Sequence, residues 1–186
     1  MRVLVAFYSE TGNTEKIAKA IWQEVSRDHE ALLKRVEEAA EETMGLHDFV
    51  FLGSPCHSTD LAAPVKKILD AFPESPSFKL AGFFTHGCPN SGEIFDRWAS
   101  RCISSFEKSS KEKRIDFVGY YHCQGAMSPP VEEAMGRYFT EQGTVSVDQW
   151  NEYNEELRKH PNHEDLQRAK EFARRVLSKS QRSTSR

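Results

Sequence analysis

The amino-acid sequence predicts an α/β fold in which helices cover both faces of a doubly wound parallel sheet. Short apolar runs, such as residues 3–6 and 49–52, have the length and composition of fully buried parallel strands. Between these runs, apolar residues recur at the spacing of an amphipathic helix, as in residues 13–27. Strands that alternate with helices form a parallel sheet, and right-handed crossovers distribute the helices over both faces.

The first half of the chain contains three of the expected strands. The Val-rich run at residues 3–6 is the first strand, and residues 13–27 follow as an amphipathic helix. Residues 31–36 form a short second strand. Residues 49–52 form a third strand, which is expected to break at the turn-forming residues 53–55.

The second half continues the alternation. Residues 61–72 and 91–106 each place their apolar side chains on one face, so both are expected to be helices. The apolar residues 80–85 and 115–121 are the fourth and fifth strands. Residues 131–138 are interpreted as a short helix or as part of an irregular excursion.

The C-terminal third departs from this regular pattern. Residues 142–161 are polar with few apolar anchors and are interpreted as an insertion. Residues 165–177 form a closing helix, and the Ser-rich basic residues 178–186 are expected to be a flexible tail. The length suits one complete core, so residues 1–186 are predicted to be a single domain. Five strands fit the order 2-1-3-4-5, in which ligands bind at the carboxyl ends of strands 1 and 3.

Composition excludes several classes of function. The formal net charge is −3, so a nucleic-acid partner is not indicated. No apolar run approaches the length of a membrane span, and no signal peptide is expected, because the first strand starts at Arg2. The four cysteines lack paired C-x-x-C spacing and are interpreted as reduced thiols in the cytoplasm.

The turn between the first strand and the first helix combines hydroxyl, amide and glycine residues. Gly12 allows a tight backbone conformation near a ligand. The unpaired N–H groups of the first helical turn point into the same space, with the positive end of the helix dipole behind them. The sequence therefore predicts a phosphate cradle, whose residues are Ser9, Glu10, Thr11, Gly12, Asn13 and Thr14.

The type of phosphate follows from the motifs that are missing. The turn matches neither G-x-x-x-x-G-K-[ST] nor G-x-G-x-x-G, the loops for nucleoside triphosphates and dinucleotides. A cradle of hydroxyl and N–H donors without an inward lysine suits a terminal monophosphate. The alternative is an ordinary helix start, because Ser, Thr and Asn are common N-cap residues.

The pattern Ser9-x-Thr11-Gly12-x-Thr14, directly after a first strand, resembles the FMN-phosphate loop of the flavodoxin family. The resemblance implies the flavodoxin-like fold and a non-covalently bound FMN. Two later patterns, G-x-x-x-C-Q-G-x-M at residues 119–127 and H-P-x-x-x-D-L at residues 160–166, resemble a longer subgroup of bacterial and archaeal flavodoxin-domain proteins. Some members of this subgroup serve tetrapyrrole (bilirubin-type) reduction.

Two further strand-end loops complete the resemblance. The loop with Ser54, Pro55, Cys56 and His57 resembles the G-[ST]-P-x-aromatic loop that lines one side of the flavin ring. It departs from the family because an imidazole stands where Trp or Tyr commonly stacks. The third loop lacks the acidic residues of many flavodoxins and is expected to flank another part of the ring through Thr85, His86, Gly87 and Cys88.

Cysteine and histidine recur at the ends of three expected strands, in Cys56-His57, His86-x-Cys88 and His122-Cys123. Such soft ligands bind zinc in other proteins. Their spacing matches no known zinc pattern, so no metal site is expected. A phosphatase-type thiol is not expected either, because no Cys-x5-Arg loop is present.

The sequence therefore predicts an FMN-binding flavodoxin-like oxidoreductase or electron-transfer protein. One hypothesis is an electron carrier that docks onto a redox partner protein. The other is an enzyme that reduces a small-molecule acceptor, such as a quinone or a tetrapyrrole, at the flavin. No residue is assigned a catalytic role, although His57 and His86 are candidate proton donors.

Overall fold

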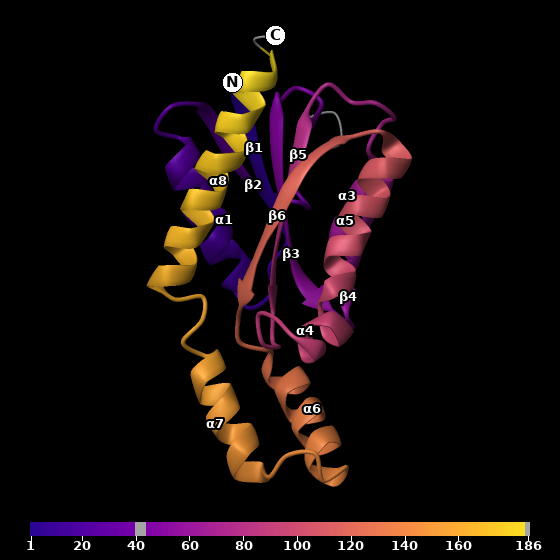
Figure 1. Ribbon diagram of the computed structural model, residues 1–186, viewed down its shortest axis with the longest axis vertical. Coiled ribbons are helices and arrows are strands. Elements are labelled where there is room, and N and C mark those ends of the chain that lie inside the picture. The colour runs from indigo at the N-terminus through magenta and orange to yellow at the C-terminus, as the bar shows by residue number, and fades with distance from the viewer. Residues whose placement is uncertain (40–43, 185–186) are drawn as a thin grey trace.

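The computed structural model describes residues 1–39 and 44–184, and shows a central sheet between two layers of helices (Figure 1). The strands are β1 (Arg2–Phe7), β2 (Glu30–Arg35), β3 (Phe49–His57), β4 (Asp60–Leu61), β5 (Lys79–His86) and β6 (Asp116–Gln124). The helices are α1 (Asn13–Val25), α3 (Ala63–Ala71), α4 (Glu93–Trp98), α5 (Ser100–Lys113), α6 (Pro129–Glu141), α7 (Val147–Leu157) and α8 (His163–Thr184). The predicted doubly wound α/β class is confirmed.

The five long strands are parallel in the order β2-β1-β3-β5-β6, which is the predicted order 2-1-3-4-5. The prediction of five strands was incomplete, because β4 pairs antiparallel with the end of β3. Strand β3 also continues through the residues at which a turn was expected. Proline has no N–H to donate to a neighbouring strand. Pro55 is tolerated in β3 because β1 ends opposite Gly53, so no β1 residue lies beside Pro55 to accept such a hydrogen bond.

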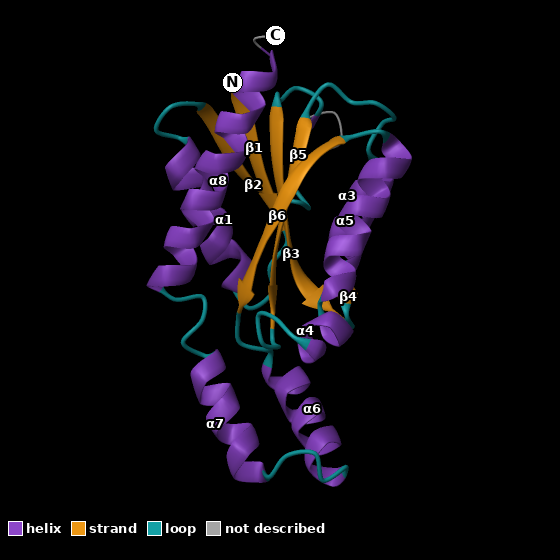
Figure 2. Cartoon of the chain, in the orientation of Figure 1, coloured by secondary structure: helices purple, strands orange, loops and turns teal. Residues whose placement is uncertain are grey.

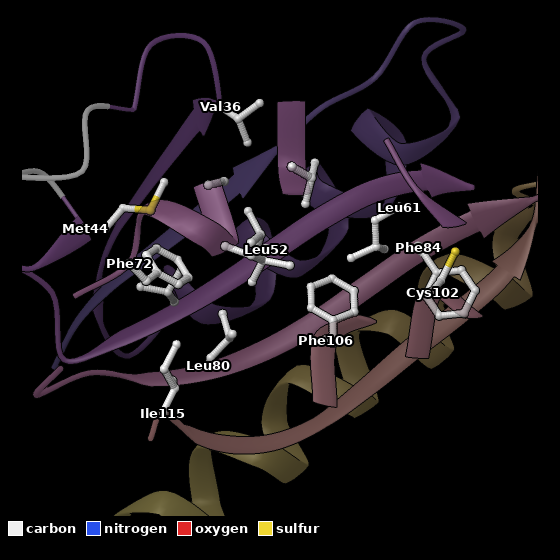
Figure 3. Packing of buried hydrophobic residues seen from close by; sticks show 14 of the residues in the cluster. Val36, Met44, Leu52, Leu61, Phe72, Leu80, Phe84, Cys102, Phe106 and Ile115 are labelled. Atoms are coloured by element: carbon white, nitrogen blue, oxygen red, sulfur yellow. The ribbon is translucent and has the colours of Figure 1, made fainter. Parts of the chain in front are cut away.

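Alternating side chains of the strands form two cores, one on each face of the sheet. Helices α1 and α8 cover one face, where Phe51 and Phe83 meet Phe172 and Val176 of α8. Helices α3, α4 and α5 cover the other face (Figure 2). Figure 3 shows this second cluster, in which the ring of Phe106 lies over the strands.

Two predicted helix boundaries were wrong. The helix expected at residues 91–106 is two helices, because the backbone leaves helical geometry at Ala99, where φ is −133°. The closing helix was expected to end at residue 177 and continues through Thr184 as α8. The expected flexible tail is therefore helical as far as residue 184, and residues 185–186 lie outside the described residues.

Helices α6 and α7 form a hairpin beyond the carboxyl ends of the strands (Figure 2). Both helices begin with residues that favour a helix start. Pro129 is the first residue of α6, and Ser146 forms a capping box with Gln149 at the start of α7. The predicted insertion at residues 142–161 thus contains a complete helix. Its residues Asn154 and Leu157 are buried.

Replacing Phe172 tests the contribution of α8 to the core. Its ring is 2 % exposed and packs edge-on against Phe51, with ring centroids 6.2 Å apart. We expect Phe172→Ala to lower the free energy of unfolding by about 3–5 kcal/mol, because a buried aromatic ring leaves a cavity. Tyr138→Ala, at a position 53 % exposed on α6, should change it by less than about 0.5 kcal/mol. Urea denaturation of both variants measures the difference, and equal effects would contradict the packing.

Candidate functional site

A cavity of about 800 Å³ lies at the carboxyl ends of the parallel strands. Its walls come from the three sequence-predicted loops, from a fourth loop after β6, and from helices α4, α6 and α7. Predicted site residues in the wall are Glu10, Thr11, Asn13, Pro55, Cys56, His57, Thr85, His86, Gly87 and Cys88. The three loops therefore converge as expected, while their role as flavin ligands stays a prediction.

The turn before α1 has the tight geometry that its glycine predicts. Gly12 has a φ of +85°, a left-handed conformation that favours glycine. Its N–H donates to Ser9 Oγ at 3.1 Å, and Thr11 Oγ1 accepts from the Asn13 amide at 3.0 Å. No side chain of the N-cap residue caps α1, so the first N–H groups of this helix remain available to an anion.

A cation that the sequence analysis missed supports the same turn. The guanidinium of Arg35, at the end of β2, donates to the carbonyl oxygen of Ser9 at 2.8 Å. It also lies over the ring of Phe7, 5.5 Å from its centroid. The adjacent ends of β1 and β2 bring these residues together, and this pairing cannot be read from a single turn motif.

Four predicted site residues do not line the cavity: Ser9, Gly12, Thr14 and Ser54. The side chains of Thr14 and Ser54 point into the protein. Thr14 is 1 % exposed, and its hydroxyl pairs with that of Thr85 at 2.8 Å. Ser54 is fully buried, where its Oγ accepts the Ala62 N–H at 2.9 Å and donates to the Pro55 carbonyl. Both hydroxyls join the loops to one another, and their role in binding a ligand stays a prediction.

The second loop presents Pro55, Cys56 and His57 to the cavity. The Cys56 thiol is half-buried and donates to the carbonyl oxygen of Trp98 at 3.4 Å. His57 is 39 % exposed, and its Nε2 lies 3.6 Å from a carboxylate oxygen of Glu10. The hydrogen bond to the same carboxylate raises the pKa of Tyr8. An acidic and an imidazole side chain therefore form the open rim of this wall.

The third loop is buried and closely packed. A Cβ added to Gly87 would lie 2.7 Å from Met127, so only glycine fits there without movement. The carbonyl oxygen of Gly87 accepts the Tyr153 hydroxyl at 2.9 Å, which ties α7 to the loop. Burial, with a smaller effect of Cys88, raises the pKa of Tyr153 to about 12.

His86 belongs to a chain of hydrogen-bonded side chains. Its Nδ1 lies 3.0 Å from the Cys88 carbonyl oxygen and 3.3 Å from the Cys88 sulfur, and its Nε2 lies 3.0 Å from Nδ1 of His122. Burial, followed by the nearby charge of His122, lowers the pKa of His86 to about 3. Burial also lowers the pKa of His122 and raises that of Cys88 to about 12. His86 is therefore neutral at physiological pH, and its role as a proton donor stays a prediction.

The sequence analysis missed two parts of the wall. The loop after β6 enters the cavity because the Asn13 amide donates to the Ala126 carbonyl oxygen at 2.8 Å. The second part is an apolar wall, whose main residues are Ile94, Trp98, Met127, Val131, Met135, Phe139, Trp150 and Tyr153. Its aromatic members pack in sequence, with ring centroids 6.2 Å apart for Trp98 and Phe139 and 5.7 Å for Phe139 and Trp150. The low apolar content of residues 142–161 concealed this contribution.

The Cys and His residues at the ends of the three strands do not all share one face of the sheet. Cys123 is buried on the α1 and α8 face, opposite to His122, because neighbours in a strand point to opposite faces. Among residues 1–39 and 44–184, no group of three His, Cys, Asp or Glu side chains is placed to hold a metal ion. In the same part of the chain, no helix has the length and apolarity needed to cross a membrane.

Residues 4–174 match the model of the flavodoxin domain family. The chain belongs to this family. The flavodoxin-like protein BilS of Clostridioides difficile is 27 % identical over 189 residues, which cover 97 % of this chain and 98 % of BilS. An uncharacterized protein of Methanocaldococcus jannaschii is 23 % identical over 178 residues, covering 95 % and 99 %. The structure of oxidised flavodoxin 2 from Bacillus cereus has a TM-score of 0.60 at 19 % identity and covers 96 % of this chain and 99 % of that one.

The flavodoxin fold typically binds a flavin, of which FMN is the usual one, and the residues present here fit that group. The uncapped helix start offers N–H groups that could bind a phosphate. A Cβ added at Gly12 would meet no atom within 4 Å outside the neighbouring residues, so the turn has open space. The large apolar cavity beside it suits a flat ring system. This flavodoxin domain thus has a place for both ends of FMN.

The neutral state of His86 predicts how stability depends on pH. The unfolded chain takes up a proton below the ordinary histidine pKa of 6.5, whereas native His86 does so only near pH 3. Stability must therefore fall as the pH is lowered through this window. One pH unit corresponds to about 1.4 kcal/mol, so lowering the pH from 7 to 5 should destabilise the wild-type protein by about 2 kcal/mol more than His86→Asn. Urea denaturation at both values measures this, and parallel losses would show that His86 titrates normally.

Proposed function

We propose that this flavodoxin domain is an FMN-dependent reductase of a small, planar, largely apolar molecule. The aromatic wall from α4, α6 and α7 carries this proposal. A flavin that only exchanged electrons with a docked protein would need an exposed ring edge, whereas this cavity continues past the strand ends into an apolar chamber. A quinone or a tetrapyrrole has the shape and polarity that such a chamber favours.

The chain's own residues have separable roles in this proposal. The turn from Ser9 to Asn13 would hold the FMN phosphate through N–H and hydroxyl donors, with Arg35 adding positive charge behind it. Pro55, His57 and Gly87 would flank the ring. Bound FMN would supply acceptance and release of one or two electrons, and the protein would supply orientation and exclusion of water. The free thiols of Cys56, Cys88, Cys102 and Cys123 suit a reducing compartment such as the cytoplasm.

An electron carrier for a redox partner protein is the second candidate. Ile94 and Val131 line the cavity and are also 55 % and 48 % exposed, so apolar surface continues from the cavity to the outside. Such surface supports docking of a partner over the flavin edge. Fast reoxidation by a protein acceptor, without reduction of any quinone or tetrapyrrole, would favour the carrier.

Thr11→Ala tests the phosphate turn. The Thr11 hydroxyl accepts from Asn13 and keeps its own hydrogen for a phosphate oxygen. A hydrogen bond to a charged group contributes about 1.5–3 kcal/mol, so FMN affinity should fall about tenfold or more. Riboflavin lacks the phosphate and is the matched control, because its affinity should change little. Fluorescence titration measures both, and an equal loss for the two flavins would place the phosphate elsewhere.

Trp150→Ala tests the aromatic wall. We expect anaerobic reoxidation of the dithionite-reduced protein by a naphthoquinone to require at least about fivefold more quinone for half-maximal rate, because about 1–3 kcal/mol of apolar contact is lost. Tyr138→Ala removes an exposed ring from α6 outside the cavity and should behave like the wild-type protein. Stopped-flow absorbance measures the rates, and FMN content is checked for each variant. If Trp150→Ala keeps the wild-type quinone dependence, the chamber is not the acceptor site.

A further inference from the structure

We propose that the Cys88 thiol donates a proton to the molecule reduced in the cavity, and that His86 and His122 pass a replacement proton from solvent. The inference rests on the proposed function, because a two-electron reduction consumes protons as well as electrons. It assigns a role to three side chains that a flavin-binding fold does not require.

The three side chains form one continuous line from the cavity to the edge of the sheet. Cys88 and His86 line the cavity. The sulfur of Cys88 lies 3.3 Å from His86 Nδ1, and His86 Nε2 lies 3.0 Å from His122 Nδ1. Strands β5 and β6 are neighbours, with Phe84 opposite His122 and His86 opposite Gln124, so the sheet register holds the two imidazoles together.

The hydrogen-bond partners determine where each imidazole carries its hydrogen. The Cys88 carbonyl oxygen only accepts, so Nδ1 of His86 carries the hydrogen that lies between them. Nε2 of the neutral His86 ring is then an acceptor, and Nδ1 of His122 donates to it. Nε2 of His122 is left with a lone pair. Each ring therefore has one N–H on its inner side and one acceptor on its outer side, as a proton relay needs.

The outer end of the line is open. His122 Nε2 has no hydrogen-bond partner among the described residues. It is also not one of the buried side-chain atoms that lack a partner there, which are Ser110 Oγ and Asn154 Oδ1, so it is not fully buried. Solvent therefore reaches Nε2 of His122. Its ring is held between those of Phe84 and Phe95, with centroids 5.2 and 4.6 Å away, which fixes its orientation.

Burial keeps all three groups in the protonation state that the relay needs. The lowered pKa values of His86 and His122 leave both rings neutral at pH 7, so each can accept one proton and pass on another. The pKa of Cys88, raised to about 12, keeps the thiol protonated. Such a thiol donates to a strongly basic atom, for example the anion that forms when hydride adds to a conjugated carbonyl.

Other titratable groups of the cavity wall are already engaged. The Tyr153 hydroxyl donates to the Gly87 carbonyl oxygen, and the Cys56 thiol donates to that of Trp98. His57 and Glu10 face each other at the exposed rim. Among these groups of the cavity wall, Cys88 differs in being connected to solvent through the imidazoles of His86 and His122.

The proton balance of the step is simple. The S–H bond of Cys88 breaks and a bond from the same proton to the reduced molecule forms. The thiolate takes the Nδ1 proton of His86, whose Nε2 takes the Nδ1 proton of His122. Nε2 of His122 takes a proton from water. One proton from solvent is consumed. Both rings then carry their hydrogen on Nε2, and they return to the Nδ1-protonated tautomers by exchange with water, because the Cys88 carbonyl oxygen accepts from Nδ1 of His86.

The first test observes the relay without turnover. Long-range ¹H–¹⁵N NMR of the FMN-bound protein at pH 7 should show His86 and His122 as neutral rings, both protonated on Nδ1. In His122→Phe, which keeps an aromatic ring between Phe84 and Phe95, the Nε2 resonance of His86 should shift because its donor is lost. An imidazolium at either position, or a hydrogen on Nε2 of His86, would overturn the relay.

The second test measures the step itself. In single-turnover reduction of a naphthoquinone by the dithionite-reduced protein, Cys88→Ala and His122→Ala should each slow the reaction about a hundredfold or more, in the range of general acid catalysis. Added imidazole should restore His122→Ala, whose missing ring it replaces, but not Cys88→Ala. His163→Ala, at an exposed position that starts α8, is the matched control and should keep the wild-type rate.

The outcomes separate the two proposals. FMN affinity is measured for every variant first, so a loss of flavin is not mistaken for a loss of proton transfer. Unchanged rates in both alanine variants, or no rescue of His122→Ala by imidazole, would overturn the relay and leave the reductase intact. A wild-type protein that binds FMN but reduces no quinone or tetrapyrrole would overturn the reductase, and the relay with it.

Discussion

The buried hydrogen bond between the hydroxyls of Thr14 and Thr85, 2.8 Å long, connects two parts of the site that the sheet alone would leave apart. Thr14 lies in the first turn of α1, which follows β1. Thr85 is the last residue but one of β5, and β3 lies between these two strands. Because both hydroxyls are shielded from water, loss of either one leaves the other unpaired, at a cost of about 1–3 kcal/mol. This bond joins the start of α1 to the third loop beneath the cavity.

The fourth wall depends on a similar arrangement. The Asn13 amide bridges Thr11 and the Ala126 carbonyl oxygen, so the turn that would hold a phosphate also positions the loop after β6. From that loop the chain enters the α6–α7 hairpin, whose Tyr153 returns to the Gly87 carbonyl oxygen. The hairpin is thus held at both ends by backbone carbonyl groups of the cavity wall. This explains how a segment outside the two main cores keeps a defined position over the site.

The polar groups of the cavity divide according to burial. At the rim, Glu10 and His57 are solvated and face each other. In the interior, the low dielectric environment disfavours charge, and His86, His122 and Cys88 are held neutral. The interior of the cavity is therefore without fixed charge at these three positions. His86, Cys88 and His122 are residue types that bind metals in other proteins, but here they are buried, neutral and linked to one another at hydrogen-bond distances.

The long strands, the helices between them and the turn at Gly12 could be predicted from sequence alone, because they follow from local patterns: continuous apolar runs, amphipathic periodicity and a glycine in a polar turn. The strand order followed from fitting these elements to a doubly wound topology. The sequence did not determine β4, the break at Ala99 or the length of α8, since tertiary packing sets where such elements end. Nor did it show that Thr14 and Ser54 turn inward or that His86 meets His122. The two histidines are 36 residues apart, and only the register of β5 against β6 decides which side chains share a face. The aromatic wall could not be predicted either, because its residues come from three helices whose relative directions no local pattern specifies.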